Sequence, residues 1–390
     1  MKLPTDSHAE RRGADELTRL SQVIADTIEP EATRVDREGN FPWKGLRALA
    51  DADLGCLLIP EALGGQGTAT AVYATALARV AAACGSTSTV YMTQLHCAHP
   101  IQLAGRPEQC ERWIPPLCAA GAVGAIALTE PEAGSDVASM RTTARLDDDA
   151  YRINGSKIFI SNGDVADVIV LFATVDPTLG RDGITAFLVE TQGLAGFEAG
   201  KPMKKLGQKG ASTVSLSFDD CRIPRDAVLG EVGAGYPLLL KSVLKSRISA
   251  AAQGVGFATG AFDATLRYCT ERDLLSARNR AAQDIQFELV ALHAEVVAAG
   301  TMLQTVSDLV DAGGEPTAAV SMAKLHCTAL GVRVSARCME ILGEDGDRID
   351  LGVERRLRDA KITEIYDGTN QVQSMLVARG LRQAAVIDNT

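Results

Sequence analysis

The sequence of 390 residues lacks the cysteine and histidine patterns that mark disulfide frameworks and zinc sites. Its nine cysteines are scattered without a CxxC pair, and its five histidines form no HExxH motif. We therefore expect neither a disulfide framework nor a metal site. Reduced thiols are typical of the cytoplasm, and a cytoplasmic location is expected.

Excess positive charge, long apolar runs and targeting segments are also missing. The formal net charge of −10 argues against a general nucleic-acid-binding protein. No apolar run approaches the length of a membrane span. The N-terminal segment lacks the apolar core of a signal peptide, and its acidic residues argue against a transit peptide.

Apolar residues recur at helical spacing in the N-terminal part of the chain. Leu17, Leu20 and Ile28 belong to such a pattern over residues 14–36. The Ala-rich segment TAVYATALARVAAAC suits a second, well-packed helix. The sequence therefore predicts a helical domain over residues 1–125.

The residue pattern changes in residues 126–235, where short runs of β-forming residues alternate with Gly, Pro, Asn and Asp. Val214, Leu216 and Phe218 alternate with serines, as on a strand that is buried on one face. Several short strands separated by turn residues predict a β domain, either a small barrel or a sandwich.

Proline is almost absent from the rest of the chain, where only Pro316 occurs from residue 238 onward. Long helices do not tolerate interior proline. The pattern predicts a C-terminal bundle of four up-and-down helices over residues 236–390. The expected helices cover residues 238–273, 281–310, 317–343 and 371–385, with Thr369 or Asn370 as the N-cap of the last one. The fold class is thus α+β, with two helical domains flanking a β domain.

Three segments contain residues suited to chemistry. The segment ALTEPEAGSD (127–136) combines hydroxyls, Pro and Gly, and can present backbone N–H groups to a phosphate or a polar ring. It is not GxGxxG, so a Rossmann site has no support. The segment KPMKKLGQK (201–209) is basic, and could meet a phosphate or simply be a solvated loop. In YDGTN, Asp367 is either a turn residue before Gly368 or a proton acceptor.

Together with KIFISNG (157–163) and RDAKITEIYDGTNQVQ (358–373), the first of these segments makes the chain resemble the acyl-CoA dehydrogenase family. The resemblance extends from FPWKGLRALADADLG to LVARG. It implies an FAD enzyme, usually a homotetramer, that removes the α-proton and β-hydride of an acyl thioester. It also implies an acyl-CoA or acyl-carrier-protein substrate, with electron-transferring flavoprotein as the acceptor.

The resemblance assigns roles to individual residues. Asp367 would be the base that takes the α-proton, and Arg247 would lie beside it. Thr129 would contact the flavin pyrimidine, Phe159 would lie against the flavin, and Ser161 would face its N5 atom, which accepts the hydride. The full set of implied cofactor residues is Leu128, Thr129, Ser135, Phe159, Ile160, Ser161, Arg272, Gln283, Glu340, Gly343, Thr369 and Gln371. The implied substrate residues are Ser135, Leu244, Ser246, Arg247 and Gly368.

Some of the cofactor residues would act across a subunit interface. The resemblance places Arg272 on the FAD pyrophosphate of a neighbouring subunit, and Thr369 with Gln371 on the FAD phosphates across the same interface. Gln283 matches another cofactor contact. Ser135 would lie between the FAD phosphates and the pantetheine arm.

The chain also departs from the family pattern. Asp367 stands where the family has Glu, and Ser246 stands where one branch carries its base instead. Leu275 and Ser276 replace a Phe-Gly pair. Glu340 and Glu344 replace a Gln and a Gly, which brings negative charge near the expected position of the FAD pyrophosphate.

Three interpretations follow from Asp367. Its side chain is about 1.5 Å shorter than Glu, and a misplacement of about 1 Å can cost roughly 100-fold in rate. The first interpretation is dehydrogenation of an acyl thioester with Asp367 as the base, which the retained Arg247 favours. The second is a flavin oxidase of another C–H acid, because nitroalkane oxidases resemble this family and use Asp. The third is an inactive FAD-binding protein in which Asp367 is only a turn residue.

Overall fold

The computed structural model describes residues 13–313 and 316–387. Its N-terminal part is helical, as the apolar spacing predicts, and Leu17, Leu20 and Ile28 are all buried. The helices are α2 (Ala14–Val23), a π-helical turn (Ile24–Ile28), α3 (Glu29–Glu38), α4 (Trp43–Asp51), α5 (Thr70–Ala83), α6 (Gly85–Ala104) and α7 (Pro107–Cys118).

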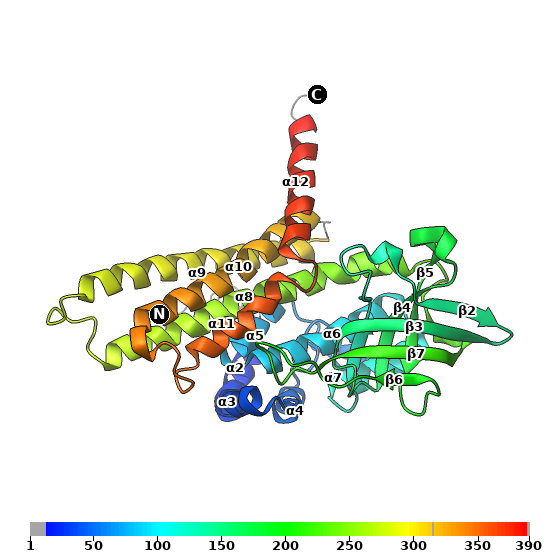
Figure 1. The fold of residues 1–390 in the computed structure, drawn as a ribbon, viewed down its shortest axis with the longest axis horizontal. Helices are drawn as coiled ribbons and strands as arrows, with labels where there is room; N and C mark the ends of the chain where they lie inside the picture. The colour runs from blue at the N-terminus through cyan, green and yellow to red at the C-terminus, as the bar shows by residue number, and fades with distance from the viewer. Residues whose placement is uncertain (1–12, 314–315, 388–390) are drawn as a thin grey trace.

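The middle part forms one mixed sheet that lies at one end of the molecule in Figure 1. Its main path runs β6-β7-β3-β2-β4-β5-β8, and β1 pairs in parallel with β4. The strands are β1 (Gly124–Ala127), β2 (Thr143–Asp147), β3 (Ala150–Ser161), β4 (Val168–Thr174), β5 (Ile184–Glu190), β6 (Phe197–Ala199), β7 (Thr213–Pro224) and β8 (Val228–Leu229). On β7, Val214, Leu216 and Phe218 are buried while the serines between them are exposed, as the alternation predicts.

Three long helices lie side by side in the C-terminal part: α8 (Gly235–Glu271), α9 (Ala282–Asp311) and α10 (Thr317–Leu342). The shorter α11 (Val353–Lys361) packs on α8 and α10, and the sequence pattern did not reveal it. Six of its nine residues are charged, so its apolar positions form only a narrow stripe on one side of a short helix. Its arginines add contacts with the N-terminal domain.

The last helix, α12 (Asn370–Ile387), differs from the expected bundle geometry. It contacts α10 but projects away from the rest of the chain (Figure 1). Met375 and Leu381 on it are 72% and 67% exposed. These two apolar side chains therefore do not pack against the other three long helices within one chain.

The two helical domains share one continuous apolar core, which includes Leu17 and Tyr91 from the N-terminal domain and Phe262 and Leu330 from the C-terminal domain. One face of β4 and β5 packs into the same core, and the other face of the sheet has a core of its own. Helix α9 is long and apolar enough to cross a membrane by composition, but it packs against α5, α8 and α10, and core helices of globular proteins meet the same criterion.

Candidate active site

Asp367 lies in a tight turn just before α12. Asp367 and Gly368 have φ values of +54° and +86°, in the left-handed region that Asp and Gly adopt most readily. Gln373 Nε2 donates to the carbonyl oxygens of Asp367 and Gly368, at 3.3 and 2.9 Å. Thr369 Oγ1 accepts from the N–H of Val372 at 3.2 Å and so caps the helix. The predicted turn and the predicted N-cap are both present.

The Asp367 carboxyl group is in an environment unlike that of an ordinary turn residue. Its Oδ2 atom is buried and has no hydrogen-bond partner among the described residues. Burial raises the pKa of Asp367 to about 6, although Lys324, Ser246 and Arg247 oppose the rise. Buried polar atoms are normally hydrogen-bonded, so an orphaned carboxyl oxygen marks a position where a polar ligand is expected.

Helix α8 presents Ser246 and Arg247 to this carboxyl group. Arg247 Nε is also buried without a partner among the described residues. Burial lowers the pKa of Arg247, while Asp367 acts in the opposite direction. Ser246 Oγ donates to the carbonyl of Val243 at 3.1 Å, and the same hydroxyl lowers the pKa of Asp367. Leu244 is half-buried on the same helix.

Lys324 on α10 is a site residue that the sequence analysis missed. Its side chain is fully buried, and its Nζ donates to Asn370 Oδ1 at 3.0 Å. Thr328 Oγ1 donates to the same oxygen at 3.1 Å. Burial lowers the pKa of Lys324 to about 8, and the negative charge of Asp367 partly offsets this. A single lysine in the apolar stretch TAAVSMAKLHC was the available signal.

A second polar cluster joins α5, α6 and α8 close to the same carboxyl group. Ser249 Oγ lies 2.7 Å from the Tyr73 hydroxyl and 3.0 Å from His96 Nε2. Burial lowers the pKa of His96 to about 4, so the imidazole is neutral at pH 7. Burial raises the pKa of Tyr73, and Asp367 adds to the rise. None of these three residues lies in a motif that marks it in the sequence.

In the β domain, a buried ion pair fixes the segment that follows β1. Lys157 Nζ donates to Glu130 Oε1 at 2.8 Å and to the Leu128 carbonyl at 2.9 Å. The N–H of Ile158 donates to the Thr129 carbonyl at 2.9 Å. Leu128 and Thr129, both implied cofactor residues, are therefore fixed in position and half-exposed.

An irregularity in β3 turns one aromatic ring outward. The register of β3 shifts between Lys157 and Ile160, and Phe159 has a φ of +60° with 63% of its surface exposed. A non-glycine residue in this conformation is strained and is typical of ligand sites. Ser161 is half-buried beside β7, and Ser135 is exposed. Ile160 is 2% exposed in the sheet core, which leaves only its backbone for a cofactor contact.

Four of the implied cofactor residues lie at the other end of the helical bundle. Arg272 follows the last residue of α8, Gln283 is in the first turn of α9, and Glu340 and Gly343 are at the end of α10. Figure 1 shows these ends together, opposite the start of α12, where Thr369 and Gln371 lie. One chain does not bring the two groups together. The carboxylate of Glu340 forms an ion pair with Arg337, which also pairs with Glu288 at 2.9 Å.

Comparison with known families accounts for nearly the whole chain. Residues 17–121 match the N-terminal domain of acyl-CoA dehydrogenases, residues 125–221 the middle domain and residues 233–382 the C-terminal domain. The short-chain-specific acyl-CoA dehydrogenase of Clostridium acetobutylicum is 34% identical over 360 residues, which are 92% of this chain and 95% of the relative.

Solved structures share the same fold. Butyryl-CoA dehydrogenase from Megasphaera elsdenii superimposes with a TM-score of 0.89 and 31% identity, over 94% of this chain and 97% of that one. A prolyl acyl carrier protein oxidase superimposes with a TM-score of 0.87 and 28% identity, over 94% of this chain and 98% of that one.

Proposed function

The chain belongs to the acyl-CoA dehydrogenase family, whose members are FAD-dependent oxidoreductases acting on CH–CH groups, and from this we propose that it dehydrogenates an acyl thioester at the α,β position with Asp367 as the base. The observation that carries the proposal is the Asp367 carboxyl group, whose Oδ2 atom is buried without a hydrogen-bond partner among the described residues and whose pKa is lowered by the positive charges of Lys324 and Arg247.

The properties of Asp367 suit proton abstraction. A pKa of about 6 leaves the carboxyl group mostly ionised at pH 7 to 8, while its desolvation makes it a stronger base than an exposed aspartate. Lys324 and Arg247 supply positive charge that keeps the carboxylate form accessible despite burial. Arg247 Nε has no hydrogen-bond partner among residues 13–313 and 316–387, so it is a donor that a bound substrate can satisfy.

The residues present are compatible with FAD. When bound, FAD supplies the two-electron acceptor for the substrate. Phe159 offers an exposed ring, Ser161 offers a half-buried hydroxyl, and the Leu128–Thr129 segment is held rigidly by the Glu130–Lys157 pair. Pre-positioned polar groups of this kind bind without a further cost of ordering.

The remaining cofactor contacts require a second copy of the chain. Arg272 and Gln283 at one end of the bundle would serve the site formed by Thr369 and Gln371 of another copy. The exposed Met375 and Leu381 on α12 supply apolar surface for such an assembly. We therefore propose a homo-oligomer, with a tetramer as the favoured form.

The acyl carrier and the electron acceptor are part of the same proposal. Coenzyme A is favoured by the likeness to acyl-CoA dehydrogenases, and a carrier-protein thioester by the likeness to the prolyl acyl carrier protein oxidase. Electron-transferring flavoprotein is proposed as the acceptor, and a cytoplasmic location is proposed for the reaction.

The test is an anaerobic titration of the FAD-loaded protein with acyl thioesters of coenzyme A and of pantetheine, monitored by loss of the oxidised flavin absorbance. We expect at least one thioester to bleach the flavin and nitroalkanes to be poor substrates. Bleaching and nitrite release with nitroethane, without reaction of any thioester, would replace the proposal with an oxidase of C–H acids. No reduction by either class would leave a flavin-binding protein without this activity.

A further inference from the structure

A chain of buried hydrogen bonds begins at Tyr366, the residue before Asp367. The Tyr366 hydroxyl donates to Gln253 Oε1 on α8. Gln253 Nε2 in turn donates to Ser88 Oγ at 2.7 Å and to Thr89 Oγ1 at 3.0 Å, both on α6. Gln253 and Ser88 are fully buried, and Thr89 is 3% exposed.

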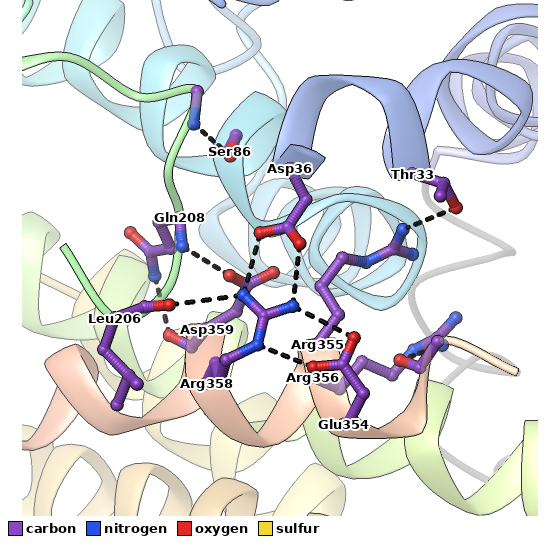
Figure 2. A network of polar contacts seen from close by, with 12 residues as sticks. Thr33, Asp36, Ser86, Leu206, Gln208, Glu354, Arg355, Arg356, Arg358 and Asp359 are labelled. Carbon is purple, nitrogen blue, oxygen red and sulfur yellow. Dashed lines mark hydrogen bonds and ion pairs between the residues drawn. The ribbon is translucent and has the colours of Figure 1, made fainter. Parts of the chain in front are cut away.

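The chain continues through the segment between β6 and β7 to α11. Thr89 Oγ1 donates to Gln208 Oε1 at 2.6 Å. Gln208 Nε2 donates to the Asp359 carbonyl at 3.0 Å, and the backbone N–H of Gln208 donates to the Asp359 carboxyl group. Figure 2 shows Gln208 facing Asp359, with Arg358 reaching to Asp36 of the N-terminal domain.

The Asp359 carbonyl group fixes the direction of the hydrogen bonds, because it can only accept and therefore requires Gln208 Nε2 to face it. The Tyr366 hydroxyl meets an amide oxygen, the Gln253 amide group meets two hydroxyls, and the Thr89 hydroxyl meets a second amide oxygen. Each member is therefore held in one orientation. In a buried environment, breaking one link leaves donors or acceptors unsatisfied at a cost far above that of an exposed bond.

The chain and Gln373 hold the Asp367 turn from its two sides. Gln373 holds the carbonyl groups of Asp367 and Gly368 from α12. Tyr366, immediately before the turn, is held by α8 and, through Gln253, by the N-terminal domain. The side chain of aspartate is one methylene shorter than that of glutamate and has one rotatable bond fewer. The position of the backbone therefore decides where the carboxyl group lies.

We propose that the buried chain Tyr366–Gln253–Thr89–Gln208–Asp359 positions the Asp367 carboxyl group for proton abstraction, and that Gln253 is its central positioning residue. This inference rests on the proposed function, because it assigns a role to residues that act on the reaction only through Asp367.

The test replaces Gln253 by methionine, which is similar in length and makes no hydrogen bond of this kind. In the FAD-loaded enzyme, we expect the rate of flavin reduction at saturating thioester to fall about 10- to 100-fold, with KM changed less than about twofold. With an α-deuterated thioester, the isotope effect on flavin reduction should increase, because proton abstraction becomes more strongly rate-limiting.

Gln304→Met is the matched control. Gln304 is 9% exposed and bridges α9 to α5 through bonds to the Ala71 carbonyl at 3.3 Å and Thr75 Oγ1 at 2.9 Å. Its loss should lower the thermal midpoint as the loss of Gln253 does. The rate of flavin reduction per bound FAD and the isotope effect should remain those of the unmodified protein.

Tyr366→Phe removes a single oxygen atom from the other end of the chain, so it gives a second measurement if Gln253→Met fails to fold. It should lower the same rate without a large loss of stability. The double variant should be no slower than the slower single variant, because both residues act through one chain.

The positioning role is wrong if Gln253→Met or Tyr366→Phe, folded and loaded with FAD, reduces its flavin at the rate of the unmodified protein. It is also wrong if the two losses multiply, or if the control slows to the same extent. These outcomes are separate from failure of the proposed function, in which the unmodified protein reacts with no acyl thioester.

Discussion

At the scale of single residues, Asp367 combines two requirements that a simple turn does not impose. Its φ of +54° suits Asp or Asn before glycine, and either residue can form this turn. A buried, unpartnered carboxyl oxygen, however, destabilises the folded protein when it is ionised. Such a cost is commonly retained where a group has a catalytic role.

Asp367→Asn separates these two requirements. We expect FAD content and folding to be retained and flavin reduction by the best acyl thioester to fall by several orders of magnitude in stopped flow, because Asn cannot accept the proton. Asp367→Glu should crowd the substrate and slow turnover if the site is built around the shorter side chain. Near-normal reduction by the Asn variant would exclude Asp367 as the base.

Asp367→Asn should be more stable than the unmodified protein at high pH. The pKa of Asp367 is raised in the folded protein. Its favourable contribution to the free energy of unfolding is therefore complete below the pKa of the unfolded state, near 4, and is lost as the pH rises through the folded-state pKa of about 6. Asn avoids this loss, which amounts to at most about 3 kcal/mol for a shift of roughly two units. The thermal midpoint of the variant should exceed that of the unmodified protein at pH 8, and the difference should shrink toward pH 4.

Lys324 sets the pH range in which Asp367 can act. The rate of flavin reduction should rise with pH around a midpoint near 6, since the base must be ionised. Lys324→Met removes a positive charge that lowers the pKa of Asp367, and the midpoint should move to higher pH by about one unit. Lys44→Met, at a lysine 68% exposed in the N-terminal domain, serves as the control. An unchanged midpoint in Lys324→Met would remove Lys324 from the site.

At the scale of elements, α11 joins the segment that carries Asp367 to the N-terminal domain. Arg358 binds Asp36 on α3 through two bonds of 2.9 and 2.7 Å, and the two side chains are 19% and 11% exposed. Burial alone would raise the pKa of Asp36, but the bonded guanidinium of Arg358 outweighs it and the pKa is lowered. The pair is therefore a charged link between two domains rather than a solvated surface pair.

We expect Asp36→Asn to lower the free energy of unfolding by about 1 to 3 kcal/mol, because it weakens two charge-assisted bonds in a partly buried site. Denaturant unfolding of the FAD-loaded protein measures the change. Asp53→Asn is the matched control, because its pair with Arg19 is 3.4 Å long and its side chain is 74% exposed. That variant should differ from the unmodified protein by no more than about 0.5 kcal/mol. Equal effects of the two substitutions would contradict the structural role of the Arg358 link.

At the scale of the whole molecule, the distribution of implied cofactor residues has a direct consequence for assembly. Arg272 and Gln283 lie at the end of the bundle opposite Thr369 and Gln371. If both groups bind one FAD, they must come from different copies of the chain. Cofactor binding and oligomerisation are then thermodynamically linked.

The purified protein should therefore be yellow, with one FAD per chain, and should form a tetramer or a dimer of dimers by light scattering. Arg272→Ala should weaken FAD binding and lower the fraction of assembled protein at low concentration, because one cross-subunit contact is lost. Arg278→Ala in the adjoining α8–α9 connection is a control without an assigned cofactor contact. A well-folded monomer that stays colourless with added FAD would contradict both the cofactor site and the assembly.

The order of the elements and the local chemistry of the turn follow from the amino-acid sequence alone. The apolar spacing predicted the helical segments, the alternation on residues 213–224 predicted a strand, and Asp-Gly predicted the bend at Asp367. These features depend on neighbours within a few residues, so a local pattern contains the necessary information. The family resemblance added the expected cofactor and the candidate base.

Which distant side chains meet depends on how the elements pack in three dimensions. Lys324 is 43 residues before Asp367 along the chain, and Gln253 is separated from Thr89 by 164 residues. Neither residue lies in a recognisable motif, because a buried polar group is identified by its partners rather than by its flanking sequence. The direction of α12 also could not be read from the sequence. Its apolar residues are compatible with a closed bundle as well as with a contact to another chain. Local sequence determines an element, whereas the burial and charge of a site arise from contacts between elements that the chain brings together on folding.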